Sequence, residues 1–137
     1  MARTPFKVEV LTPEGEAYND EAEMVSTRTS VGSIGLLARH QPLLAMLDPT
    51  ELRIYKSESD VLRFAQGEGF IQVAGERVLV LVDELFDVDD LDTGDLQERL
   101  KRAEGEIESS QEDTEERRVA ERDKRRYEAF LKIAGGG

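Results

Sequence analysis

The 137-residue sequence contains no cysteine and only one histidine, His40. The lack of cysteine excludes a disulfide framework and a thiolate metal site, and it favours a cytoplasmic-type compartment. The hydrolase motifs G-x-S-x-G and H-E-x-x-H are also missing. Gly67-Glu68-Gly69 is no phosphate-binding loop, because it lacks the Walker lysine and the helix that should follow it. The sequence therefore predicts no catalytic residue, no metal site and no cofactor.

No apolar run in the sequence approaches the length needed to cross a bilayer. The first five residues lead directly into a strand-like segment, Phe6 to Leu11, which leaves no room for a signal or transit peptide. We therefore expect no direct membrane insertion, and any association with a membrane would go through protein partners.

Basic side chains are scarce and unevenly distributed, and the formal net charge is -12. Residues 1–90 carry 17 acidic and 8 basic side chains, residues 91–116 carry 10 and 3, and residues 117–137 carry 3 and 7. The acidic body would repel phosphates, so no nucleic acid partner is expected. The basic last segment is either a solvated helix face, with cations favoured near the helix C-terminus, or a surface for an acidic partner.

The first 90 residues have the pattern of many short strands. Phe6-Lys7-Val8-Glu9-Val10 alternates apolar with charged residues, and Pro13-Glu14-Gly15-Glu16 then predicts the turn of a hairpin. The run Val78–Val82 is continuously apolar, and we expect it to be buried on both faces. Short strands with regular turns and no intervening helix predict an antiparallel sandwich or barrel. Further strands are expected at residues 22–29, 51–56, 61–65, 70–73 and 77–82.

The spacing of the apolar residues changes after residue 90 from that of strands to that of helices. Apolar residues from Leu96 to Ile107 follow at spacings of four, three and four, which predicts a helix with one narrow apolar stripe and Asp92 as its cap. A second helix is expected from about residue 112 to 134. The predicted fold class is α+β in two parts, namely an N-terminal antiparallel β-sandwich over residues 1–90 and a C-terminal antiparallel two-helix hairpin over residues 91–137.

The predicted hairpin has few apolar side chains to bury, so its docked stability is small at roughly 25 cal/mol per Å² of apolar area. Two interpretations remain open. The hairpin is either a solvated element without a regulatory role, or a switch that exchanges packing partners of similar free energy.

One stretch, residues 32–47, reads Gly-Ser-Ile-Gly-Leu-Leu-Ala-Arg-His-Gln-Pro-Leu-Leu-Ala-Met-Leu, and Gly69-Phe70-Ile71-Gln72-Val73 follows later. By its residues alone it is a structured loop between strands, with two glycines at a tight turn and Pro42 redirecting the chain. The pattern resembles the signature of the epsilon subunit of bacterial F-type ATP synthases, G-x-I-G-[apolar]2-x-x-H-x-P-L-[apolar]. Residues 10–16 further resemble that family's opening strand and turn, and the resemblance covers nearly the whole chain.

This resemblance implies a non-catalytic rotor subunit that binds the gamma subunit in the central stalk and sits against the ring of c subunits. Such a subunit couples proton-driven rotation to ATP synthesis in the α/β head, at the cytoplasmic face of a bacterial membrane. The family's c-ring-facing loop matches the turn from Gly32 to His40, which implies contacts by Ser33, Arg39 and His40. Ser33 stands where many relatives have an acidic residue, so one charge contact is missing. His40 is given no proton-transfer role.

In bacterial relatives the two helices can extend into the head, where basic residues meet an acidic motif of the β subunits and block ATP hydrolysis. The resemblance implies this role for a basic face of the second helix, formed by Arg118, Arg122, Arg125 and Arg126. Three of these residues are spaced by four and would share one side of the helix.

Some relatives bind ATP through a motif of the form [IL]-D-x-x-R-A at the start of the first helix. The matching stretch here is Leu91-Asp92-Thr93-Gly94-Asp95-Leu96, in which Asp95 replaces the arginine. An anionic side chain near a triphosphate is unfavourable, so we expect weak or no nucleotide binding. Asp92, Arg122 and Arg126 remain the candidate contacts for a nucleotide.

Two other functions are compatible with the same two parts. The first is an adaptor, a β-domain with a partner-binding helical hairpin that has no link to a rotary motor. The second is a free ATP-sensing module, which Asp95 disfavours and which nucleotide titration would test.

Overall fold

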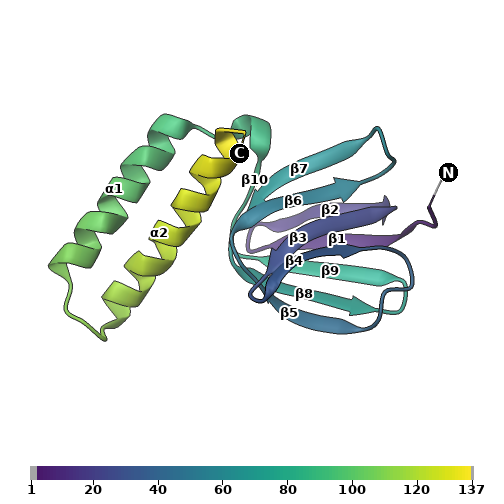
Figure 1. Cartoon of the computed structure of the whole chain (residues 1–137), viewed down its shortest axis with the longest axis horizontal. Helices are drawn as coiled ribbons and strands as arrows, with labels where there is room; N and C mark the ends of the chain where they lie inside the picture. Colours follow the sequence, from purple (N-terminus) through teal and green to yellow (C-terminus); the bar gives the residue numbers. More distant parts are fainter. Residues whose placement is uncertain (1–2, 137) are drawn as a thin grey trace. The chain divides into compact units, whose positions relative to one another are not determined.

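The structure is a computed structural model that describes residues 3–136 of the chain. It divides into two compact units, residues 1–87 and 88–137. The first is built of strands and the second of helices (Figure 1). The predicted α+β class, with a β-sandwich followed by a helical hairpin, is confirmed. The boundary expected at residue 90 falls at the end of a short 3-10 helix, η1 (Val88–Asp90).

The strands of the first unit form two layers that β3 connects. β3 pairs with β6 through Met24–Ser26 and with β5 at Thr29. The β6 layer contains β10, β7, β6, β3 and β4, and the β8 layer contains β5, β8, β9, β1 and β2. Within the described residues the strands are β1 (Phe6–Thr12), β2 (Gly15–Ala22), β3 (Met24–Thr29), β4 (Gly32–Leu36), β5 (Leu43–Leu47), β6 (Thr50–Tyr55), β7 (Val61–Gln66), β8 (Gly69–Ala74), β9 (Arg77–Val82) and β10 (Leu85–Asp87).

The inward side chains of the two layers meet in one core. Leu52 and Ile54 of the β6 layer and Ile71 and Val80 of the β8 layer are fully buried members of the same apolar cluster. Burial alternates along these strands, as the pleat requires. Each layer therefore has an outer face that the core does not use.

β9 corrects one expectation from the sequence. Its apolar run was expected to be buried on both faces, but Val80 is fully buried while Leu81 is 43% exposed. The expectation was wrong because a continuous apolar run does not require two buried faces. Here one side of the strand fills the core, and the other carries apolar side chains on the outer surface.

The buried side chain of Gln66 links three segments of the first unit through hydrogen bonds. Gln66 is 0% exposed, and its Nε2 donates hydrogen bonds to the backbone oxygens of Asp48 at 3.1 Å and Gly67 at 3.0 Å. Thr27 Oγ1 donates to Gln66 Oε1 at 2.6 Å. Since buried polar groups are costly when unpaired, this one side chain fixes β3, β7 and the turn after β5 together.

We expect the substitution Gln66→Leu to destabilise the sandwich by about 1–3 kcal/mol, because the Asp48 and Gly67 carbonyls lose their donor and Thr27 loses its acceptor. Amide hydrogen exchange of β3 and β7 measures the loss. Gln72→Leu is the matched control, since Gln72 is exposed on β8, and we expect it to leave exchange unchanged. Equal exchange in the two variants would contradict a role for the buried network.

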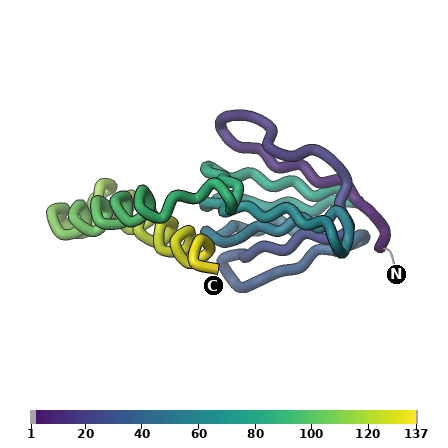
Figure 2. Tube along the Cα trace, turned by 90° about the horizontal axis from the view of Figure 1, so that it is seen from above, coloured from purple at the N-terminus to yellow at the C-terminus, as the bar shows by residue number. Residues whose placement is uncertain are grey.

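The second unit is an antiparallel helical hairpin. α1 (Thr93–Ser109) and α2 (Glu115–Ala134) lie side by side in both views (Figures 1 and 2). Asp92 caps α1 as expected, and its carboxylate accepts the Asp95 N–H at 3.1 Å. Within residues 3–136, no helix is long and apolar enough to span a bilayer.

α2 begins three residues later than expected. Asp113 has a φ of 60°, so the chain is in the left-handed region there and cannot yet be helical. Thr114 then caps the helix, and its hydroxyl accepts the Arg117 N–H at 3.2 Å.

Candidate functional site

The outer face of the β8 layer carries a row of apolar side chains that crosses four strands. The strand register places Met46 of β5 opposite Phe70 of β8, Phe70 opposite Leu81 of β9, and Leu81 opposite Leu11 of β1. Met46 is 60% exposed, Phe70 50% and Leu81 43%. We call Leu11, Met46, Phe70 and Leu81 the apolar row. Leu44, 71% exposed, extends it along β5.

The apolar row is a surface that suits a protein partner. Single exposed apolar residues are ordinary, but a contiguous strip across neighbouring strands indicates an interaction site. Its members include an aromatic residue and a methionine, which are enriched at protein interfaces. The four side chains of the row are apolar, so the row suits contact with the apolar surface of another protein.

Gly69 lets β8 and β9 approach closely enough to form the row. A Cβ at position 69 would lie 1.8 Å from the backbone oxygen of Leu81, far inside any real contact. The position immediately precedes Phe70, and the same close approach brings Phe70 and Leu81 opposite each other. The Gly69-Phe70 pair is therefore a packing requirement of this face.

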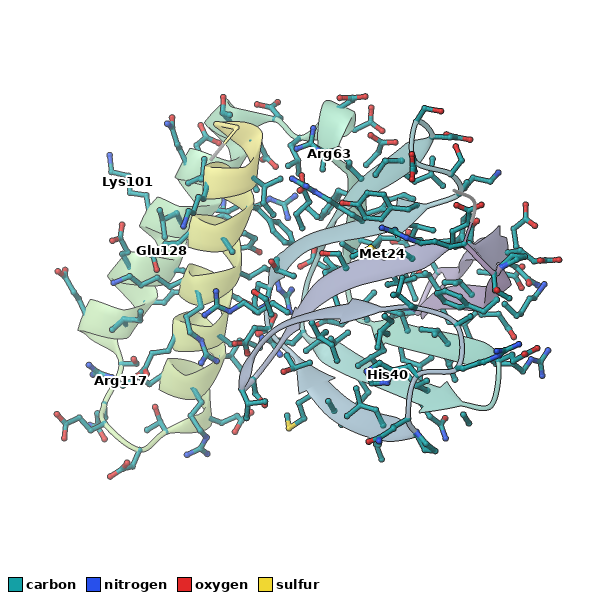
Figure 3. All side chains as sticks on the ribbon, turned by 45° about the vertical axis from the view of Figure 1, so that its right-hand side comes forward. Met24, His40, Arg63, Lys101, Arg117 and Glu128 are labelled. Carbon is teal, nitrogen blue, oxygen red and sulfur yellow. The ribbon has the colours of Figure 1, made fainter. Side chains whose placement is uncertain are left out.

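The residues assigned to the family's c-ring-facing loop lie at both ends of β4. Ser33 is opposite Arg28, beside the β3–β4 turn. Arg39 and His40 follow Leu36, which is opposite Val25 at the other end of the strand. His40 Nδ1 lies 2.7 Å from the Gln41 backbone oxygen, so it acts there as a hydrogen-bonding loop residue (Figure 3). The structure does not bring Ser33 together with Arg39 and His40.

The β3–β4 turn exposes one residue that sequence reasoning missed. Val31 is 95% exposed at the tip of this hairpin. Thr29 Oγ1 holds the turn, since it accepts the Val31 N–H at 3.3 Å and donates to the Gly32 oxygen at 3.0 Å. The sequence could have indicated this exposure, because Val31 is an apolar residue inside a turn of small and polar residues, where no core position is available.

The basic residues of α2 differ widely in exposure. Arg118 and Arg125 are exposed, and Arg118 pairs with Glu115 at 3.1 Å. The Arg122 side chain is 43% exposed and pairs with Asp123 at 3.2 Å, whereas Arg126 is only 4% exposed. The exposed cations surround a shallow groove of the hairpin, lined by Ile107, Arg117, Arg118, Glu121, Lys124, Arg125 and Glu128.

The candidate nucleotide contacts are divided between the start of α1 and the second helix, α2. The Asp92 carboxylate is engaged as the α1 cap, and Arg122 and Arg126 lie on α2. A second groove of the hairpin is rich in carboxylates, and Arg99 in it pairs with Asp95 at 2.9 Å. None of the three candidates lines this groove, which is formed by Asp95, Glu98, Arg99, Arg102, Ala103, Glu106, Asp123 and Tyr127.

The edge strand β2 is anionic. The Glu21 backbone N–H donates to Asp20 Oδ1 at 2.8 Å and holds the pKa of Asp20 below its usual value, with Lys56 at 3.7 Å adding to the effect. Burial, helped by Asp20 and Asp60, raises the pKa of Tyr18. A charged edge of this kind resists pairing with another strand.

Comparison with known proteins identifies relatives that match most of the chain. A family model described as ATP synthase, Delta/Epsilon chain, beta-sandwich domain, matches residues 5–87. An ATP synthase epsilon chain of Persephonella marina is 35% identical over 95% of this chain and 96% of its own length. The epsilon chain of a Sulfurihydrogenibium species is 30% identical over 94% and 96%. A chain of the central stalk and c-ring of the Tetrahymena thermophila mitochondrial ATP synthase has a similar fold, with a TM-score of 0.65 and 20% identity over 98% of this chain and 99% of that one.

Proposed function

The chain belongs to the family of ATP synthase epsilon chains and is a subunit of that complex, and from this premise we propose that it is a non-catalytic rotor subunit of a proton-translocating F-type enzyme. It couples rotation of the c-ring to ATP synthesis in the α/β head. It is peripheral at the cytoplasmic face of a bacterial membrane and is held there by its partners. The observation that carries this proposal is the apolar row, a binding surface without catalytic groups.

The gamma subunit is the proposed partner of the apolar row. A subunit that must turn with the stalk needs a stable interface, and stable interfaces bury an apolar core of the kind that Met46, Phe70 and Leu81 offer. The inner faces of the strands that carry the row pack in the core, so its side chains are held on a rigid support. An adaptor unrelated to a rotary motor would present a similar face but would not bind gamma.

The c-ring is the proposed partner of the β3–β4 turn and β4. Val31 and Ser33 lie at one end of β4, and Arg39 and His40 lie beyond the other end. A contact with the c-ring that involves all four residues would therefore be made at two separate points. Because Ser33 carries no charge, contact at the turn depends on the apolar tip formed by Val31 rather than on an ion pair.

We further propose that the hairpin inhibits ATP hydrolysis when it extends into the head. The groove with Arg117, Arg118, Lys124 and Arg125 offers an exposed cationic surface to an acidic segment of the β subunits. Arg122 and Arg126 do not line this groove, and Arg126 would join the surface only on rearrangement because it is buried. Such charge pairing supplies specificity and salt dependence more than affinity.

Titration of an α/β/γ core with the full chain tests the inhibition. We expect the full chain to suppress ATP hydrolysis, and the double substitution Arg118→Gln with Arg125→Gln to weaken suppression about tenfold, because two exposed charge contacts are lost. Lys101→Gln with Lys132→Gln removes the same charge from exposed positions outside the groove and serves as control. Equal suppression by both double variants would exclude the groove that contains Arg118 and Arg125 as the inhibitory surface.

Nucleotide binding is expected to be weak or absent. Four carboxylates and two arginines line the carboxylate-rich groove of the hairpin, and Asp95 occupies the position of the motif's cation. In isothermal titration calorimetry we expect no measurable heat at ATP concentrations below about 1 mM, equivalent to a binding free energy weaker than about -4 kcal/mol. Micromolar binding by the unmodified chain would favour the ATP-sensing interpretation instead.

A further inference from the structure

The outer face of the β6 layer has a charge opposite to that of the rest of the sandwich. Residues 1–87 contain eight basic side chains, and four of them, Arg3, Arg28, Arg53 and Arg63, lie on or beside this face. The register places Ser26 opposite Arg53 and Arg53 opposite Arg63, across three neighbouring strands. We call Arg28, Arg53, Arg63 and Glu51, the carboxylate that pairs with Arg53 and Arg63, the arginine patch.

Glu51 holds two of the arginines in place. Its Oε2 accepts the Arg53 Nε–H at 2.5 Å, and its Oε1 accepts the Arg63 Nε–H at 2.8 Å and also bonds Arg63 Nη2. The Glu51 side chain is 15% exposed, whereas each of the two arginine side chains is 46% exposed. Two guanidinium groups therefore share one sheltered carboxylate and present their remaining N–H donors with a net positive charge, already ordered before any partner arrives.

The surroundings of the arginine patch are those of a protein interface. Met24 of β3 lies opposite Tyr55 of β6 on the same outer face, and both side chains are partly exposed. Arginine, methionine and tyrosine are the residue types enriched at the centres of protein interfaces. A free phosphate or a lipid headgroup would make no apolar contact with Met24 and the Tyr55 ring, whereas the side chains of a polypeptide can, so the composition of this face favours a polypeptide.

We propose that the arginine patch docks an acidic segment of a partner protein, which lies across β3, β6 and β7. Carboxylates of the segment take the free donors of Arg53 and Arg63, and apolar side chains of the segment contact Met24 and Tyr55. The inference does not rest on the proposed rotor function, because the patch lies on the β6 layer and the apolar row on the β8 layer, the opposite outer face of the sandwich. Both surfaces can therefore be occupied at once.

Nuclear magnetic resonance titration of the full chain tests the proposal. The probe is a 12-residue peptide of alternating glutamate and leucine, with the glutamine–leucine peptide as its uncharged control. We expect the glutamate peptide to shift the Nε–H signals of Arg53 and Arg63 and the amides of Ser26 and Tyr55. The double substitution Arg53→Gln with Arg63→Gln should weaken its binding at least tenfold, and Lys56→Gln with Arg77→Gln, the same charge change elsewhere on the sandwich, less than twofold.

Other outcomes would overturn the proposal. Shifts confined to α2 would show that the peptide binds only the cations of that helix. The absence of shifts at Arg53 and Arg63 would show that the arginine patch does not bind the peptide. Inorganic phosphate, or vesicles containing phosphatidylglycerol, will also be titrated at equal charge concentration. If either produces the same shifts, the patch is a general anion site and not a site for a protein segment. If the arginine double variant fails to fold, Arg28→Gln is measured instead, and a loss of binding below twofold would also contradict the proposal.

Discussion

The substitution Gly69→Ala is expected to destabilise the sandwich by at least about 3 kcal/mol. The new Cβ would lie 1.8 Å from the Leu81 backbone oxygen and 2.8 Å from the Val82 Cα, and neither atom can move without separating β8 from β9. Urea unfolding, followed through the methyl signals of the core residues, measures the loss. The same variant should also bind gamma poorly, because the apolar row crosses the boundary between these strands.

Gly105→Ala is the matched control for that experiment. Gly105 lies within α1, and a Cβ there would meet no atom within 4 Å. Alanine is a better helix former than glycine, so we expect this variant to stabilise the hairpin by about 0.5–1 kcal/mol and to leave the sandwich unchanged. If the free energy of unfolding of Gly69→Ala were within about 1 kcal/mol of that of the original chain, the close approach of β8 and β9 would not be the constraint on stability that we infer.

The substitution Phe70→Asp is expected to weaken binding to the isolated gamma subunit at least a hundredfold. A carboxylate at the centre of the apolar row would lose its water on docking without gaining a partner, and aromatic residues at interface centres carry much of the binding energy. Since Phe70 is 50% exposed, the variant should fold normally. Biolayer interferometry with immobilised gamma measures the affinity.

Ala17→Asp controls for the added charge in that experiment. Ala17 is exposed on the edge strand β2 and lies outside the apolar row, so its variant should bind gamma within twofold of the original chain. If Phe70→Asp kept the full affinity for gamma, the gamma subunit would have to bind another face of the chain. Loss of affinity in both variants would point instead to a general effect of negative charge.

The sequence predicted the elements that follow simple periodicity and missed those set by tertiary structure. β1 alternates apolar with charged residues, and its burial alternates in the same way. The residue types of β9 do not alternate between apolar and polar, although the burial of its side chains does. Its sequence therefore could not distinguish a strand buried on both faces from one that carries exposed apolar side chains on one face. The outer apolar row became visible only when the register of four strands was known.

The candidate sites show the same limit. Helical spacing grouped Arg126 with Arg118, but Arg126 lies on the side of α2 that includes the buried Phe130 and Ile133. The helix start depended on Asp113 and Thr114, whose backbone conformation no periodicity reveals. Glu51 and its two arginines are twelve residues apart at their widest and meet only through the pairing of β6 with β7. Residue type and spacing predicted local structure, whereas strand pairing decided which side chains share a surface.

Site-specific photo-crosslinking at position 70 in the assembled ATP synthase tests the central claim most directly. The photoreactive residue p-benzoylphenylalanine replaces Phe70 in one sample and Gln97, an exposed residue of α1, in another. We predict that position 70 crosslinks to the gamma subunit in high yield during both ATP synthesis and rest, because the apolar row is a permanent rotor interface. A chain that assembles with the complex but crosslinks at position 70 to no subunit, or to a stator subunit, would contradict this account.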